Sequence, residues 1–266
     1  MGEVIAVVSG KGGVGKTTAV ANIGAALASL GKRVLLVDAD MGLRNLDIAL
    51  GTENEIVYDV ADVLDGVCDI SDAVIAIKSI DGLYFIPSPQ TRNSSCILND
   101  SFKAFCMDMA NSYDFVIVDG PAGVGEGFFK AISGANRAVV VAQGYMPSLR
   151  DADRTIDFLE KQGITEISVL INSMRPELVE KGIMQNADYI LDVLGTSLLG
   201  IIPEDFKLLG SASEKKIAVL DEEAISKEAF LNTARRILGE SVPIAEFNQE
   251  KNKKKKKRFF MWRRNK

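Results

Sequence analysis

The sequence predicts an α/β fold with a doubly wound, mainly parallel sheet and helices on both of its faces. Short apolar runs rich in β-branched residues recur along the chain, and such runs are typical of strands buried on both faces of a parallel sheet. Helical patterns separate these runs, which gives the β-α-β alternation of doubly wound folds. A chain of 266 residues, 47% of them apolar, is long enough to bury a large core.

Seven apolar runs are expected to form the strands. In chain order they are VIAVVS (4–9), RVLLVD (33–38), LYFIP (83–87), FVIVD (115–119), AVVVA (138–142), ISVLI (167–171) and LLGII (198–202).

Five helices are expected between and after these strands, at 16–30, 101–112, 151–162, 186–194 and 226–238. Three of them are followed by glycine, at Gly31, Gly163 and Gly195, and glycine is the residue that most often ends a helix.

The composition excludes several kinds of active site. The chain contains no histidine, so neither a Ser-His-Asp nor a Cys-His mechanism is available, and a zinc site is not expected. General acid–base chemistry must therefore fall to carboxylates, lysines or water. The three cysteines, Cys68, Cys96 and Cys106, form no CxxC pair, which indicates reduced, cytosolic thiols. No apolar run of about 18 residues and no basic leader is present, so neither a membrane-spanning helix nor a secretory signal is expected.

Charge is distributed unevenly along the chain. The net charge is −5, but residues 251–266 contain ten Lys and Arg and no acid, so the rest has 21 basic and 36 acidic residues, a balance of −15. The body is expected to repel anionic surfaces, and the tail to bind one. We expect a folded domain at 1–239, a linker with a lysine run at 240–257 and a tail at 258–266.

One stretch carries a phosphate-binding pattern. GKGGVGKT at 10–17 has the spacing G-x-x-x-x-G-K-T, directly after the first predicted strand and before the first predicted helix, which is the context that this motif requires. The glycines let backbone N–H groups curve around phosphate oxygens at the positive end of the helix. Lys16 is expected to pair with the β- and γ-phosphates, and the Thr17 hydroxyl to bind Mg²⁺.

The variant KGGVGKT resembles the deviant Walker A motif of the MinD/ParA family of ATPases. The resemblance implies a P-loop NTPase fold, ATP and Mg²⁺ as cofactors, and hydrolysis of ATP to ADP and phosphate. It also implies that Lys11 reaches across a homodimer interface to the phosphates of the partner's ATP; on the residues alone, Lys11 could equally be a solvated loop lysine. The nucleotide-binding positions implied in the loop are Gly10, Lys11, Gly12, Gly13, Val14, Gly15, Lys16, Thr17 and Thr18.

Three aspartates follow predicted strands, Asp38 and Asp40 after the second and Asp119 after the fourth. They would lie at the carboxyl edge of the sheet, where ligands bind. The resemblance implies that Asp40 orients the attacking water and acts with Lys11 and Lys16 in catalysis. It places Asp38 and Asp119 with Thr17 around Mg²⁺, and it assigns γ-phosphate sensing to a loop at 120–123. Without the family, an aspartate after a strand is most often a helix cap.

A base pocket is expected at two later strand ends. Asn172 follows ISVLI, and the stretch IPED at 202–205 follows LLGII. The resemblance implies that Asn172 reads adenine through its amide and that Pro203 belongs to a loop that closes over the base. Without the family, Asn172 would be an ordinary turn residue.

Further segments resemble the family members that place the cell-division site. They span residues 3 to about 240 and include DADMGLRNLDIALG, DGPAGVGEGFFKAI, SLRDADRTIDFL, INSMRPELVEKG and LLGIIPED. The resemblance implies recruitment of a MinC-like division inhibitor and stimulation of hydrolysis by a MinE-like activator. The stretches VGEG (124–127) and AQGYMPS (142–148) depart from the family pattern, so the partners are less determined than the use of ATP. Candidate partner contacts, which could equally be an exposed, salt-bridged helix start, are Asn45, Arg150, Asp151 and Asp153.

The tail combines positive charge with aromatic side chains. Phe259, Phe260, Met261 and Trp262 are consecutive and lie between basic residues at 253–258 and 263–264. The resemblance implies a membrane-targeting segment here; aromatic rings favour the headgroup boundary, and each basic residue near anionic lipid contributes about 1 kcal/mol. The alternative is a solubilising, disordered tail. We therefore expect a cytoplasmic protein that binds reversibly to the inner face of the cell membrane.

Together these features predict an ATP-dependent, dimerising membrane switch that places the division site. The alternative is a ParA-type ATPase of DNA partitioning, whose tail would bind DNA; the acidic body and the aromatic cluster argue against nucleic acid. An electron-transfer iron–sulfur ATPase would need two cysteines per subunit at the dimer axis, and Cys96 and Cys106 lack the glycine-rich surroundings expected for it.

Overall fold

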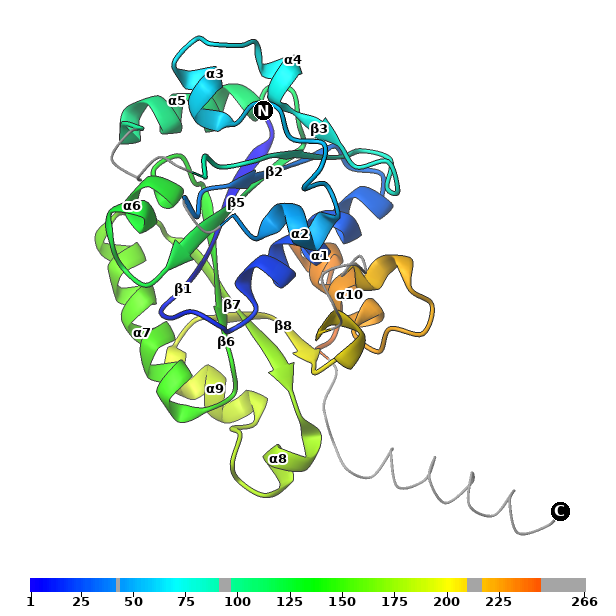
Figure 1. Cartoon of the computed structure of the whole chain (residues 1–266). Coiled ribbons are helices and arrows are strands. Elements are labelled where there is room, and N and C mark those ends of the chain that lie inside the picture. Colours follow the sequence, from blue (N-terminus) through cyan, green and yellow to red (C-terminus); the bar gives the residue numbers. More distant parts are fainter. Residues whose placement is uncertain (42–43, 91–96, 210–216, 245–266) are drawn as a thin grey trace, which may run out of the picture.

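The computed structural model describes residues 1–41, 44–90, 97–209 and 217–244. These residues form one eight-stranded sheet between two layers of helices (Figure 1). The strand order is β3-β4-β2-β5-β1-β6-β7-β8, and every neighbouring pair is parallel except β3 with β4. The predicted fold class is therefore confirmed. The strands are β1 (Glu3–Ser9), β2 (Val34–Asp38), β3 (Ile75–Ala76), β4 (Leu83–Ile86), β5 (Phe115–Ala122), β6 (Arg137–Ala142), β7 (Glu166–Met174) and β8 (Ser197–Pro203).

The seven predicted apolar runs form the seven parallel strands, and the structure adds β3, a two-residue antiparallel partner of β4. One boundary differs in a way that matters for the site. β5 continues to Ala122, which pairs with Ser9 after a register shift in β1. Gly120 and Pro121, which were predicted to lie in a loop, therefore belong to the strand, and the chain turns only at Gly123, which has a φ of 80°.

The longer helices occur where the sequence predicts them, and several short ones were not predicted. Helices of four or five residues complete barely one turn, so no apolar period marks them. The α-helices are α1 (Lys16–Ser29), α2 (Leu46–Leu50), α3 (Val60–Leu64), α4 (Ile70–Ala73), α5 (Asn99–Met109), α6 (Glu126–Ile132), α7 (Met146–Lys161), α8 (Pro176–Glu180), α9 (Ala187–Leu194) and α10 (Lys227–Ile237), and two 3₁₀ turns are η2 (Phe206–Leu209) and η3 (Ala218–Leu220).

The predicted start of the helix at 151 is wrong. α7 begins five residues earlier, at Met146, and Pro147 lies in its first turn. A proline is tolerated there because the first N–H groups of a helix have no partner within the helix. Arg150 and Asp151 are consequently in the second turn of α7 rather than at its beginning.

The two helix layers follow from the handedness of the crossovers. β1 has β5 on one side and β6 on the other. The connection from β1 through α1 leads to β2, whereas the connection from β5 through α6 leads past β1 to β6, so right-handed crossovers place α1 and α6 on opposite faces. α2 and α10 pack on the α1 face, and α3, α5, α7 and α9 pack on the α6 face (Figure 1). The strand order therefore reverses at β1, and doubly wound folds bind their ligands at the carboxyl end of the sheet beside such a reversal.

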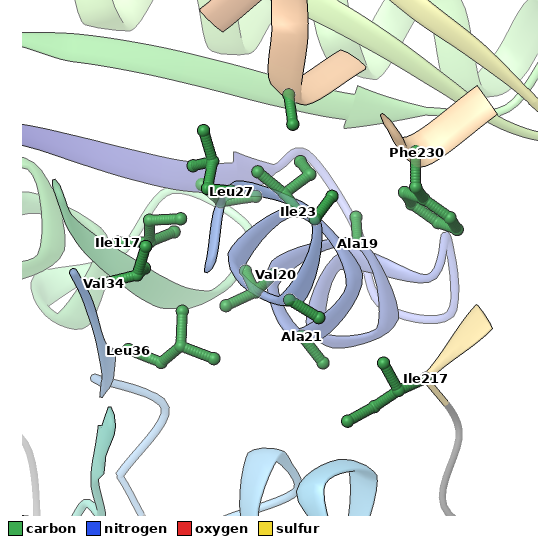
Figure 2. Packing of buried hydrophobic residues seen from close by; sticks show 14 of the residues in the cluster. Ala19, Val20, Ala21, Ile23, Leu27, Val34, Leu36, Ile117, Ile217 and Phe230 are labelled. Atoms are coloured by element: carbon green, nitrogen blue, oxygen red, sulfur yellow. The ribbon is translucent and has the colours of Figure 1, made fainter. Parts of the chain in front are cut away.

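α1 is buried almost all round. Figure 2 shows Val34 and Leu36 of β2 and Ile117 of β5 on one side of this helix, and Phe230 and Ile217 from the C-terminal part of the chain around the rest. Small residues allow this close packing: a Cβ on Gly24 would lie 2.6 Å from a methyl group of Leu36. The core therefore fixes the first turn of α1 at the carboxyl edge of the sheet.

Arg236 of α10 holds the end of the described chain. Its guanidinium donates hydrogen bonds to the backbone oxygens of Val242 (2.8 Å), Pro243 (2.7 Å) and Leu199 (3.0 Å), so the chain after α10 is tied to the edge strand β8. The predicted tail and most of the predicted linker lie outside the described residues. Among the described helices, none is long and apolar enough to span a membrane.

Candidate functional site

The phosphate-binding loop connects β1 to α1, as the sequence predicts. Gly13 and Gly15 have φ values of 80° and 87°, a conformation that is open to glycine at little energetic cost. The side chain of Ser9 donates a hydrogen bond to the Lys11 carbonyl (3.0 Å), and the Gly123 amide donates to the Ser9 carbonyl (2.9 Å). The loop is therefore attached to the end of β5 and leads directly into the amino terminus of α1.

Lys16 and Asp119 form a buried ion pair beneath the loop. The ammonium group of Lys16 donates a hydrogen bond to Oδ1 of Asp119, and both side chains are less than 10% exposed. Asp119 is the last residue of the predicted strand in β5, and β5 lies beside β1. The loop lysine and the carboxylate expected near Mg²⁺ are thus already in contact.

Asp38 and Asp40 complete an acidic cluster at the same edge. Asp38 is in register with Asp119 on the neighbouring strand, and its Oδ1 accepts a hydrogen bond from the Asp40 amide (2.9 Å). Burial, and next the charge of Asp119, raise the pKa of the Asp38 carboxyl to about 8. The pKa of Asp40, which is half-buried, is also raised, mainly by burial and against the opposing effect of Lys16.

This cluster fits a bound cation. Oδ2 of Asp38 is buried and has no hydrogen-bond partner among the described residues, which is uncommon for a buried polar atom. Hydroxyl and carboxylate oxygens are the donors that Mg²⁺ prefers, and Thr17, at the second position of α1, and Asp119 supply further ones. Asp38, Asp119 and Thr17 are therefore the residues that would hold the ion, directly or through water.

Lys11 lies in the exposed part of the loop, with Gly12 and Gly13. Its side chain is thus exposed to solvent, whereas that of Lys16 is buried. This position is compatible with the predicted contact across a dimer interface.

The predicted base-pocket residues lie at the ends of β7 and β8. Asn172 is buried, and its side-chain nitrogen donates a hydrogen bond to the Val14 carbonyl (3.0 Å). Pro203 ends β8, and the next residue, Glu204, forms an ion pair with Arg175. The loop after Pro203 is anchored by buried Asp205, which accepts hydrogen bonds from the amide (3.0 Å) and hydroxyl (2.8 Å) of Ser226.

Three of the candidate partner contacts are exposed, namely Asn45, Arg150 and Asp153. Asp151 is half-buried because it packs against the loop: a Cβ on Gly10 would lie 2.6 Å from the backbone oxygen of Asp151. The proposed partner surface on α7 and the phosphate-binding loop are therefore in direct contact.

The cysteines lie away from this cluster. Cys106 of α5 is buried among apolar side chains, and burial raises the pKa of its thiol to about 12. Cys68 is half-buried, and burial followed by the carboxylates of Asp62, Asp72, Asp69 and Asp59 raises its pKa. Cys96 lies outside the described residues.

Some residues that shape the site were not predicted. The buried Ser88 hydroxyl donates to the Asp40 carbonyl (3.4 Å), and buried Asn22 of α1 accepts a hydrogen bond from the Ala218 amide (2.6 Å). Ser88 follows LYFIP, so its place after a strand end could have indicated it. Asn22 gave no signal, because its partner lies 196 positions away.

Comparison with known proteins agrees with this geometry. The family model of the CobQ/CobB/MinD/ParA nucleotide-binding domain matches residues 5–219. The septum site-determining protein MinD of Bacillus subtilis is 42% identical over 255 residues, which cover 95% of each chain. The chain belongs to the MinD proteins of the MinD/ParA family.

Solved MinD structures have the same fold. The MinD chain in the MinC:MinD cell division protein complex of Aquifex aeolicus is 42% identical and superposes with a TM-score of 0.85 over 92% of this chain and all of that one. MinD of Pyrococcus horikoshii, complexed with Mg-ADP, is 26% identical, with a TM-score of 0.80 over 91% of this chain and all of that one. Family membership therefore supports a nucleotide-binding ATPase fold with the septum-site proteins as relatives.

Proposed function

We propose that this MinD-family chain is a Mg²⁺-dependent ATPase that dimerises on ATP and thereby brings a division inhibitor to the inner face of the cell membrane. The observation that carries the proposal is the buried cluster of Lys16, Asp119 and Asp38 directly beneath a phosphate-binding loop. A glycine-rich loop with no catalytic role would not need charged groups in the core, because burying them is unfavourable unless they serve a partner or ligand.

Each residue of the site has a proposed role. Loop amides and Lys16 bind the phosphates of ATP, and Asp40 orients the attacking water. A bound Mg²⁺, held by Thr17, Asp38 and Asp119, would neutralise charge on the phosphate oxygens. Lys11 of each subunit contacts the ATP of the other and completes the charge stabilisation only in the dimer.

The dimer then determines membrane binding. One tail, with Phe259, Phe260, Met261 and Trp262 and its basic flanks, binds weakly, whereas two tails on one dimer bind with a high effective concentration, enough for a gain of about 10² or more. Hydrolysis separates the subunits and releases the membrane. The Aquifex relative is complexed with MinC, which supports a MinC-like inhibitor as the recruited partner. The exposed residues Arg150 and Asp153 of α7 are the proposed contact. A MinE-like activator that stimulates hydrolysis stays part of the proposal.

Lys11→Ala tests the proposal. Lys11 is exposed, so its removal should leave folding unchanged. We expect the variant to bind Mg-ATP, to stay monomeric in light scattering when ATP is present, and to hydrolyse ATP at least tenfold more slowly. That loss corresponds to about 1.4 kcal/mol or more of transition-state stabilisation. Lys103→Ala, which removes an exposed lysine from α5, is the matched control and should behave as the unmodified chain.

Dimerisation and turnover of the Lys11→Ala variant at the level of the control would overturn the dimer mechanism. DNA partitioning is the second candidate. Retention on duplex DNA that falls with salt, without any binding to anionic vesicles, would favour it instead.

A further inference from the structure

Asn172 lies where β7 departs from regular strand geometry. The register between β7 and β8 shifts between Ile171 and Met174, and Ser173 has a φ of 55°, one of only two non-glycine residues with positive φ in the described chain. Such a conformation costs about 1 kcal/mol or more and is found where the surrounding structure imposes it, often at functional sites. Irregular strand positions of this kind re-aim a side chain; here the re-aimed side chain is Asn172.

The amide of Asn172 fits into the phosphate-binding loop itself. Its nitrogen donates to the Val14 carbonyl (3.0 Å), and the side chain is only 7% exposed. The next residue, Gly15, leaves room for it: a Cβ at Gly15 would overlap the side-chain nitrogen of Asn172. The absence of a side chain at Gly15 thus makes room for the Asn172 amide, which lies 158 positions from Val14 in the sequence.

This contact controls the direction of a loop amide. The Val14 carbonyl and the Gly15 N–H belong to one planar peptide unit and point in opposite directions. A hydrogen bond that holds the carbonyl toward β7 therefore holds the Gly15 N–H away from β7. Backbone N–H groups of this loop are the donors for phosphate oxygens, so the orientation of this peptide unit decides whether one of them is ready to bind.

We propose that Asn172 is a positioning residue for the phosphate-binding loop, in addition to its expected contact with the base. A side-chain amide carries both an NH₂ donor and a carbonyl acceptor, so the nitrogen can hold Val14 while the oxygen accepts a hydrogen bond from the amino group of adenine. One side chain would then join the base pocket to the phosphates. The inference rests on the proposed nucleotide binding for its role, but the loop contact itself can be tested without a nucleotide.

The test uses two variants of the full chain and one control. Asn172→Ala removes the donor, and Asn172→Asp keeps the shape but places an oxygen against the Val14 carbonyl. Ser168→Ala is the matched control, because Ser168 is also buried on β7 and its hydroxyl has no hydrogen-bond partner among the described residues. The first measurement is amide hydrogen exchange of the loop, residues 10–18, in ligand-free protein.

The second measurement is the affinity for Mg-ATP and for Mg-tripolyphosphate, which has no base. We expect both Asn172 variants to speed exchange in the loop and to weaken tripolyphosphate binding about tenfold, the effect of one lost hydrogen bond whose acceptor stays buried. ATP binding should fall by at least that factor. Ser168→Ala should change none of these quantities.

The outcomes separate this inference from the function on which it rests. Faster loop exchange and weaker tripolyphosphate binding in both variants support it. Unchanged loop exchange, with a loss confined to ATP, would show that Asn172 contacts only the base and would overturn it. If the unmodified chain binds neither ATP nor tripolyphosphate, the proposed function fails, and the exchange measurement alone decides whether Asn172 positions the loop.

Discussion

At the scale of single residues, the site is a set of polar groups that need a ligand. Lys16 and Asp119 pair with each other, but Asp38 is buried beside Asp119, and one of its oxygens has no hydrogen-bond partner among the described residues. The raised pKa of Asp38 has the same origin, since burial and a neighbouring carboxylate both disfavour its ionised form. Such an arrangement is ready for a cation rather than for another side chain.

The cysteines provide a test of burial at this scale. Burial raises the pKa of Cys106 to about 12, and burial with four carboxylates raises that of Cys68. In a Cys96→Ser variant at about pH 8, we expect a thiol-reactive dye to label Cys68 slowly and Cys106 only after unfolding in urea. The Cys68 rate should rise as the pH is raised to about 9 and beyond, because the thiolate is the reactive form. Two rapidly labelled thiols in the folded protein would contradict the burial of Cys106.

How far the sequence predicts the site depends on the distance between contacting residues. The loop motif is local, so Gly15, Lys16 and Thr17 could be placed from their spacing, and Asp38 and Asp119 from their positions after strands. The hydrogen bond between Asn172 and Val14 could not be predicted, because it needs the order of the strands and the irregular backbone at Ser173. The roles of Lys11 and Asp40 still rest on the family resemblance.

At the scale of elements, the phosphate-binding loop lies between α1, β5, β7 and α7. Its contact with α7 is close, since the backbone of Asp151 fills the space beside Gly10. A partner bound to the exposed face of α7 would therefore contact the helix that packs against the loop.

Two glycines of the loop test this packing. A Cβ on Gly10 would lie 2.6 to 2.9 Å from three atoms of Asp151, whereas one on Gly12 would meet only Ala122, at 3.9 Å. Neither glycine has a positive φ. We expect Gly10→Ala to lower the free energy of unfolding by about 1–3 kcal/mol, the usual effect of overpacking, and Gly12→Ala to change it by less than about 0.5 kcal/mol. Urea denaturation without nucleotide measures both free energies of unfolding. Equal effects of the two substitutions would contradict close packing of α7 against Gly10.

Elements also differ in how well the sequence predicts them. Most of the parallel strands are rich in β-branched residues and buried on both faces, so a short apolar run is enough to predict them. The sequence pattern predicts the start of α7 five residues too late, although the proline at 147 is a residue favoured in a first helical turn. The five-residue helices α2, α3 and α8 depend on packing against their neighbours, which a local pattern does not contain.

At the scale of the whole molecule, the proposed function couples the two ends of the chain. In the proposed mechanism, the loop at residues 10–18 controls whether two copies dimerise, and the basic and aromatic residues at 251–266 control whether the dimer binds a membrane. Arg236 ties the chain after α10 to the edge strand β8, so the last described residues before the tail sequence are held on the body. Under this proposal, two tails bind one membrane together only when ATP holds two subunits in a dimer.

Co-sedimentation with anionic vesicles tests this link most directly, with Mg-ATP, Mg-ADP or no nucleotide, for the full chain and for a chain ending at Glu250. We predict that the full chain sediments with Mg-ATP and at least tenfold less in the other two conditions, and that the shortened chain stays in the supernatant throughout. Equal sedimentation of the full chain in all three conditions would contradict it.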